Sequence, residues 1–158
     1  MDHGYAPSSA FLVQVANGDV PITGSAFAKE NLRRVIALMQ DDDVSNRDWA
    51  TMLVAITEVD TPEVRHALLT AAADEDAAVR AEALSGLATR DKALAMPLIA
   101  EELLRHECEY ATFEAAEIIG DPAYLPALHK WLQSVQRSHV QDQIADAIAA
   151  CSEAAQAS

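Results

Sequence analysis

One short segment of the chain carries three neighbouring side chains of the kinds that bind metal ions. His106, Glu107 and Cys108 follow one another in LLRHECEY. A zinc site takes three or four such ligands, and thiolate ligands come in closely spaced pairs. Cys108 has no second thiol at that spacing, and the five histidines (positions 3, 66, 106, 129 and 139) recur at no fixed place. We therefore expect neither a metal site nor another cofactor.

Sequence patterns of hydrolases and nucleotide-binding proteins are also missing. The chain has no Gly-x-Ser-x-Gly, no glycine-rich phosphate loop and no His-Glu-x-x-His. Cys108 and Cys151 are too few to form a disulfide framework, which favours two reduced, packed thiols. We expect a protein that is not an enzyme.

The charge of the chain narrows the classes of partner. The net charge is −14, and residues 1–40 contribute nothing to it because they hold three acids and three bases. Nucleic-acid binding draws on Lys and Arg, and anionic lipid also attracts bases, so the acidity argues against both partners. No long apolar run or secretory signal is present, which favours a cytoplasmic protein. The acidic surface would attract a basic partner.

Internal repetition indicates how the chain is built. Segments that start at Asp41, Asp74 and Glu107 align when Arg47, Arg80 and Thr112 are superposed, which gives steps of 33 and 32 residues, and a weaker copy starts near His139. Apolar residues recur at helical spacing inside each copy. A period of this length fits two helices of about twelve residues with tight turns.

The second helix of each unit has its own start signals. Thr61 and Pro62 open TPEVRHALLTAA as N-cap and first helical residue. Asp121 and Pro122 open DPAYLPALHKWL. Pro126 in that segment and Pro97 in ALAMPLIAEELL are expected in or near the first turn of their helices.

The ends of such a stack need covers, because one hairpin cannot bury its apolar face alone. Residues 25–40 form an amphipathic pattern and are predicted as an N-terminal capping helix. Residues 1–24 are predicted as an arm with little regular structure. The predicted fold is all-α, an α–α superhelix of three to four hairpins in a single domain, 25–158, with repeats at about 41–73, 74–106 and 107–137 and a partial one at 138–152.

The residues resemble a known family at this point. DEDAAVRAEALSGLA, followed by LAMPLIAEEL, and FEAAEIIGDPAYLPAL are similar to the HEAT-like repeats first noted in phycobilin lyases, over residues 41–150. SNRDWATMLVAITEVDTPEVR looks like small bacterial HEAT-repeat proteins of undefined role. Such repeats serve unrelated tasks, so the resemblance implies the fold and not a specific activity.

Two enzyme branches of these folds use residues that this chain does not share. Deoxyhypusine hydroxylase, also built of HEAT-like repeats, holds a di-iron site in several His-Glu pairs, whereas this chain has one such pair, His106-Glu107. A register set by Gly120-Asp121-Pro122 places Tyr110-Ala111 or Phe113-Glu114 near the metal position instead. The DNA-glycosylase branch uses a basic groove, which an acidic chain does not supply.

Two tryptophans occupy positions that other repeats leave polar, since Trp49 aligns with Glu82 and Glu114, and Trp131 with Glu102 and Thr70. Trp49 could pack under the capping helix and Trp131 against the last helix, or either could be an exposed binding anchor. For Trp49 we favour packing. For Trp131 packing and an exposed binding anchor both remain open.

The resemblance implies that second helices line a concave face. The non-core residues predicted to bind a protein partner there are His66, Thr70, Leu98, Glu101, Glu102, His129, Lys130, Trp131 and Gln133.

Three hypotheses about function follow. The first is a non-catalytic adaptor or scaffold whose concave acidic helical face binds a basic or amphipathic segment of a protein partner. The second is a small lyase- or hydroxylase-type enzyme or cofactor-handling protein. The third is a structural protein whose acidic repeats form a homo-oligomer. Arg47 and Arg80, each shortly after an acidic turn, are expected to join adjacent repeats through Asp–Arg contacts rather than to bind a ligand.

Overall fold

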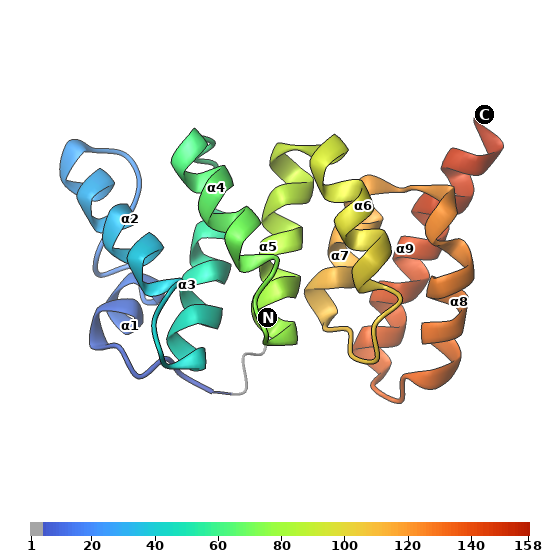
Figure 1. Ribbon diagram of the computed structural model, residues 1–158, viewed down its shortest axis with the longest axis horizontal. Coiled ribbons are helices and arrows are strands. Elements are labelled where there is room, and N and C mark those ends of the chain that lie inside the picture. The colour runs from blue at the N-terminus through green and yellow to red at the C-terminus, as the bar shows by residue number, and fades with distance from the viewer. Residues whose placement is uncertain (1–4) are drawn as a thin grey trace. The chain divides into compact units, whose positions relative to one another are not determined.

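The computed structural model describes residues 5–158, and all regular structure among them is helical (Figure 1). The predicted all-α class, with helices paired as in an α–α superhelix, is confirmed. The chain divides into two compact units: the first ends at Ala83 and the second is Leu84–Ser158. The boundary lies inside one helix, α5 (Ala77–Arg90).

The first unit is organised around α3 (Val44–Ile56), which contacts α1 (Ala10–Ala16), α2 (Ala26–Leu38) and α4 (Pro62–Ala71). The side chains that meet between these helices are apolar and almost fully buried: Leu12, Val35, Met39, Val54, Val64 and Leu68. Burying each of them stabilises the fold by roughly 1.5–3 kcal/mol relative to exposure.

Each of these helices begins at a residue whose side chain accepts a hydrogen bond from a free backbone N–H. Ser9, Ser25, Asp43 and Thr61 are the four N-caps, and Thr61 precedes Pro62 as the sequence predicts. A side-chain cap of this kind contributes about 1 kcal/mol.

The N-terminal arm differs from the expectation of little regular structure, because residues 10–16 form α1. Leu12 and Val15 are buried, and the Arg34 guanidinium of α2 lies 3.8 Å from the centre of the Phe11 ring. Packing on α2 and α3 selects the helix for this part of the arm. Residues 1–4 of the expected arm lie outside the described residues.

The segment before α1 is held on the start of α3 by hydrogen bonds. The Ser8 hydroxyl donates to Asp43 Oδ2 at 2.6 Å, and the Ser9 N–H donates to Asn46 Oδ1 at 2.9 Å. The bond from Ser8 and those from Ser45 hold the pKa of Asp43 below its ordinary value.

The two aligned arginines make equivalent contacts. Arg47 Nη1 donates to the carbonyls of Asp41 and Asp42, and Arg80 Nη1 donates to those of Asp74 and Glu75, one repeat further on. Arg47 also reaches the next acidic turn, because its Nε and Nη2 donate to the Asp74 carboxylate at 3.0 and 3.3 Å. The structure therefore shows the predicted Asp–Arg contact between successive repeats at Arg47.

The second unit is organised around α9 (Ser138–Gln156), which contacts α7 (Tyr110–Ile119), α8 (Leu125–Ser134) and a short 3₁₀ helix, η1 (Pro122–Tyr124). Helix α6 (Lys92–Glu102) contacts α7. The largest buried side chains of this unit are Leu84, Leu87, Ile99, Phe113, Tyr124, Leu128 and Ile144.

Polar contacts join the helices of this unit at specific points. The Tyr124 hydroxyl donates to the Met96 carbonyl at 2.9 Å, and burial raises its pKa. Gly120 ends α7 with φ at +66°, a left-handed conformation that favours glycine.

The two prolines expected in or near a first turn differ in position. Pro126 is at the start of α8, whereas Pro97 is the sixth residue of α6, because that helix begins at Lys92 with Asp91 as its cap. The expectation for Pro97 was therefore wrong: an earlier cap added a turn in front of it.

Candidate protein-binding surfaces

The residues predicted for recognition are divided between the two units. His66 and Thr70 lie on α4 in the first unit, and both are exposed. The Thr70 hydroxyl donates to the His66 carbonyl at 3.0 Å, so it is engaged with its own helix. The other seven residues lie on α6 and α8 in the second unit.

The two glutamates at the end of α6 have different surroundings. Glu101 is exposed, whereas Glu102 is only 3% exposed and its carboxylate accepts a hydrogen bond from Arg105 Nε at 3.0 Å. The Glu102 carbonyl also accepts from the Cys108 thiol at 3.2 Å. Glu102 therefore stabilises the turn between α6 and α7, and its place on a recognition face was predicted wrongly. Leu98 is half-buried.

Helix α8 carries the remaining predicted residues. His129, Lys130 and Gln133 are exposed, but Trp131 is half-buried. Its indole N–H donates to the Leu103 carbonyl at 2.8 Å, and its ring meets the Phe113 ring edge-on with centres 6.1 Å apart. Trp131 is thus packed, and these contacts are with the end of α6 and with α7 rather than with the last helix.

The indole of Trp49 is hydrogen-bonded to the N-terminal segment. Its indole N–H donates to the Tyr5 carbonyl at 2.9 Å, and the Tyr5 hydroxyl donates to the neighbouring Asp48 at 2.5 Å. The N-terminal segment, and not the capping helix, supplies these contacts. Asp48 is 1% exposed, so this pair of hydrogen bonds lies at the edge of the core.

The residues with metal-binding chemistry are scattered. His106 and Glu107 are both exposed in the turn after α6. In the part of the chain that the structure describes, no three His, Cys, Asp or Glu side chains lie close enough together to hold a metal ion. Cys108 and Cys151 are free thiols, and burial raises the pKa of Cys151 to about 11.

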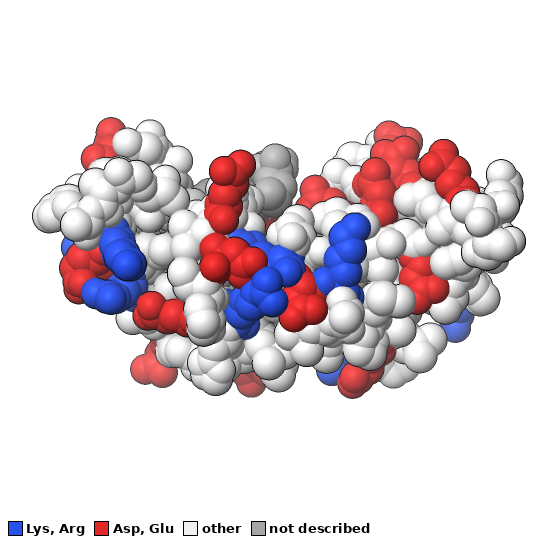
Figure 2. Space-filling model, turned by 90° about the horizontal axis from the view of Figure 1, so that it is seen from above, with Lys and Arg blue, Asp and Glu red and all other residues white. Residues whose placement is uncertain are grey.

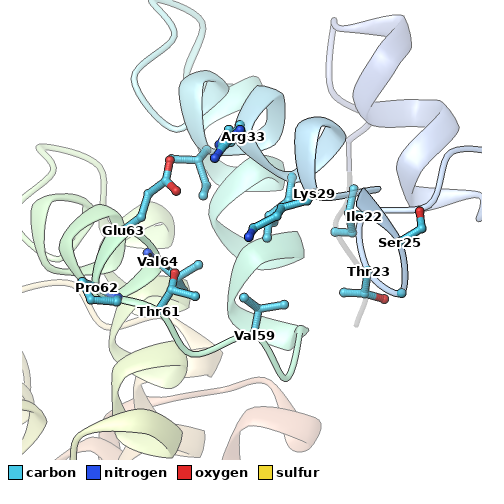
Figure 3. Close-up of a pocket in the computed structure, with 13 residues that line it drawn as sticks. Ile22, Thr23, Ser25, Lys29, Arg33, Val59, Thr61, Pro62, Glu63 and Val64 are labelled. Atoms are coloured by element: carbon cyan, nitrogen blue, oxygen red, sulfur yellow. Dashed lines mark hydrogen bonds between the residues drawn. The ribbon is translucent and has the colours of Figure 1, made fainter. Parts of the chain in front are cut away.

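The first unit contains a groove that the sequence did not reveal. Between α2 and α4 lies a hollow of about 550 Å³, with Leu32, Ile36 and Val64 among its apolar walls and Lys29, Arg33 and Glu63 among its charged residues (Figure 3). A second hollow, of about 630 Å³, shares Ile22, Thr23 and Val59 with it. The Lys29-x-x-x-Arg33 spacing was the one available signal, because it places two cations on one side of a helix.

Helix α2 carries a local group of cations. Figure 2 shows Lys and Arg side chains in several groups, one of which lies at its left over α2, the helix that carries Lys29, Arg33 and Arg34. Acidic residues outnumber basic ones in both units, by 14 to 6 over residues 1–83 and by 11 to 5 over residues 84–158. The cations of α2 are therefore a local exception on a chain that is acidic in both units.

Comparison with known proteins shows distant relatives. No family model matches the chain. Protein YibA of Escherichia coli K12 is 26% identical over 125 residues, and so is Protein YibA of Escherichia coli O157:H7. The match covers 79% of this chain but 41% of each relative, so the chain spans about two fifths of the length of these curated proteins.

The X-ray structure of Escherichia coli YibA is similar to this chain with a TM-score of 0.56 at 21% identity. The match covers 87% of this chain and 54% of that one. At this identity the likeness shows the fold alone. No helix among the described residues is long and apolar enough to cross a membrane.

Proposed function

We propose that this chain is a non-catalytic, HEAT-like adaptor that binds a protein partner in the cytoplasm through the exposed side of α6 and α8. One observation carries the proposal: apolar and acidic side chains are exposed together on and just after α6. Met96 is 38% exposed and Leu104 80%, with the exposed carboxylate of Glu101 between them in sequence.

Exposed apolar side chains next to charges are typical of surfaces that bind proteins. Leu104 has the largest exposed fraction among the large apolar side chains of the described residues, and a partner that covered it would gain its burial energy. The surplus of acidic residues in the second unit would attract a basic or amphipathic segment and accelerate its association. His129, Lys130 and Gln133 on α8 would select among such partners.

Affinity capture from source cells tests this proposal. The bait is the full chain at near-physiological salt, and the test variant combines Met96→Ser with Leu104→Ser. Phe27→Ser is the matched control, because Phe27 is 73% exposed but lies on α2 in the first unit. We expect one partner to be retained by the native chain and by the control and lost from the test variant. Raising the salt concentration should weaken retention.

Two outcomes would contradict the proposal. The first is a native chain that retains no protein at near-physiological salt. The second is a partner that binds the Met96→Ser/Leu104→Ser variant as well as the native chain. Metal analysis of the purified protein tests the enzyme alternative, since stoichiometric iron or zinc would replace the adaptor proposal with a hydroxylase-type one.

A further inference from the structure

The groove of the first unit has the size and lining of a site for a small molecule. The hollow between α2 and α4 measures about 550 Å³, within the range of roughly 300–1,000 Å³ that is typical of ligand pockets. Leu32 and Ile36 line it from α2, and Val64 lines it from α4. Ile22 comes from the loop before α2, and Val59 comes from the loop before α4. Figure 3 shows these loops on either side of the space.

A second hollow extends the apolar surface. It meets the first at Ile22, Thr23 and Val59, and is lined beyond them by Val15 and Leu53 among others. Ile56, which is 61% exposed, also lines it. An apolar chain that ran from the first hollow into the second would therefore cover side chains that are now in contact with water.

The charges along this groove differ from one end to the other. Lys29 lines the first hollow, and its amine points toward the space between α2 and the start of α4 (Figure 3). No carboxylate among residues 5–158 lies within salt-bridge distance of the Lys29 amine, whereas Arg33 is paired with Glu30 at 3.2 Å. Glu58 lines the second hollow. The first hollow thus holds two cations, Lys29 and Arg33, and one carboxylate, Glu63. The second hollow holds the carboxylate of Glu58, and apolar walls lie between the two.

We infer that this groove binds an elongated apolar monocarboxylate, with its carboxylate at Lys29 and its hydrocarbon chain along Ile22 and Val59 into the second hollow. The apolar walls supply most of the affinity. Lys29 supplies the preference for an anion, and Glu58 disfavours a second carboxylate at the far end. The site shares no residue with the proposed protein-binding surface on α6 and α8, so either can exist without the other.

Titration calorimetry with three ligands of equal chain length tests the inference. The probes are decanoate, decanol and decanedioate, all below the concentration at which decanoate forms micelles. We expect decanoate to bind one per chain and more tightly than decanedioate. Lys29→Gln should weaken decanoate about threefold to fivefold, the effect of one exposed ion pair, and leave decanol unchanged. Lys92→Gln, which removes an exposed lysine at the start of α6, is the control and should leave decanoate binding unchanged.

Two further variants distinguish binding in the groove from nonspecific binding of the ligand. Val59→Glu places a carboxylate where the two hollows meet and should abolish binding of decanoate and decanol, while its far-ultraviolet circular dichroism stays native. Glu58→Gln should bring decanedioate close to decanoate. Absence of saturable decanoate binding would overturn the inference. So would equal loss of decanoate affinity on Lys29→Gln and Lys92→Gln, or undiminished binding of decanoate to a folded Val59→Glu variant.

Discussion

The contact between Arg47 and Asp74 offers the sharpest test of how successive repeats are joined. Replacing Arg47 by Met keeps an aliphatic stem of similar length but removes the guanidinium. Four hydrogen bonds are lost: two to the Asp74 carboxylate, at 3.0 and 3.3 Å, and two to the carbonyls of Asp41 and Asp42, at 3.1 and 3.3 Å.

The expected cost depends on how far this ion pair is removed from water. Both side chains are 13% exposed, so the pair lies between a surface pair, worth about 0–1 kcal/mol, and a buried one, whose disruption costs about 3–5 kcal/mol. We expect Arg47→Met to lower the free energy of unfolding by about 2–3 kcal/mol. In a chain of this length that corresponds to a fall in Tm of about 5–10 °C.

Urea unfolding followed by tryptophan fluorescence measures this cost. Trp49 lies on α3 in the same unit as Arg47, and a Trp131→Phe background makes it the only tryptophan. Arg65→Met is the matched control, because Arg65 pairs with Asp60 at 2.6 Å in the same unit but the two side chains are 39% and 40% exposed. The control should cost less than about 1 kcal/mol.

A double-mutant cycle with Asp74→Asn isolates the pair, and its coupling energy should be about 1–2 kcal/mol. Two results would refute the reasoning. One is an Arg47→Met variant no less stable than Arg65→Met. The other is a coupling energy below about 0.5 kcal/mol, which would mean that the contact between repeats contributes nothing specific.

Three further predictions concern single positions. Gly120→Ala should lower the free energy of unfolding by about 1 kcal/mol, because φ is +66° there; an unchanged urea midpoint would contradict this. Ser8→Ala should raise the pKa of Asp43 toward its ordinary value, measured by NMR titration. Because folding lowers that pKa, the stability that Asp43 contributes is present above its ordinary pKa and is lost as pH falls through the folded value; a pKa unmoved by the substitution would exclude the Ser8 bond as its cause. At pH 8 Cys108 should react with a thiol reagent while Cys151, whose pKa is about 11, reacts only on unfolding, and two fast thiols would show that α9 is packed differently.

Local signals in the sequence were reliable where a single helix or turn decides the outcome. The step from Arg47 to Arg80 corresponds to two equivalent sets of hydrogen bonds to carbonyls, because each arginine follows an acidic turn at the same distance. Thr61 and Pro62 start α4 as predicted, since capping depends on the backbone of the first turn alone.

Other expectations failed where a distant element decides the outcome. Residues 10–16 belong to the arm that was expected to have little regular structure, yet they are helical because Leu12 and Val15 are buried on one side of α1. Glu102 and Trp131 occupy the same position of their repeats as Thr70, which is polar and exposed. The turn after α6 buries the Glu102 carboxylate against Arg105, and the end of that helix accepts the Trp131 indole N–H.

The amino-acid sequence by itself determined that this chain is a series of helical hairpins that repeat about every 33 residues. Helical periodicity and capping are local properties of the backbone, so they can be recognised in the sequence. Only the tertiary structure decided which polar side chains remain at the surface. It also created the groove, since Ile22, Lys29 and Val59 come from three separate segments and meet only when α2 and α4 lie beside α3. A binding site formed between elements has no period in the sequence, and its residues become recognisable once their packing is known.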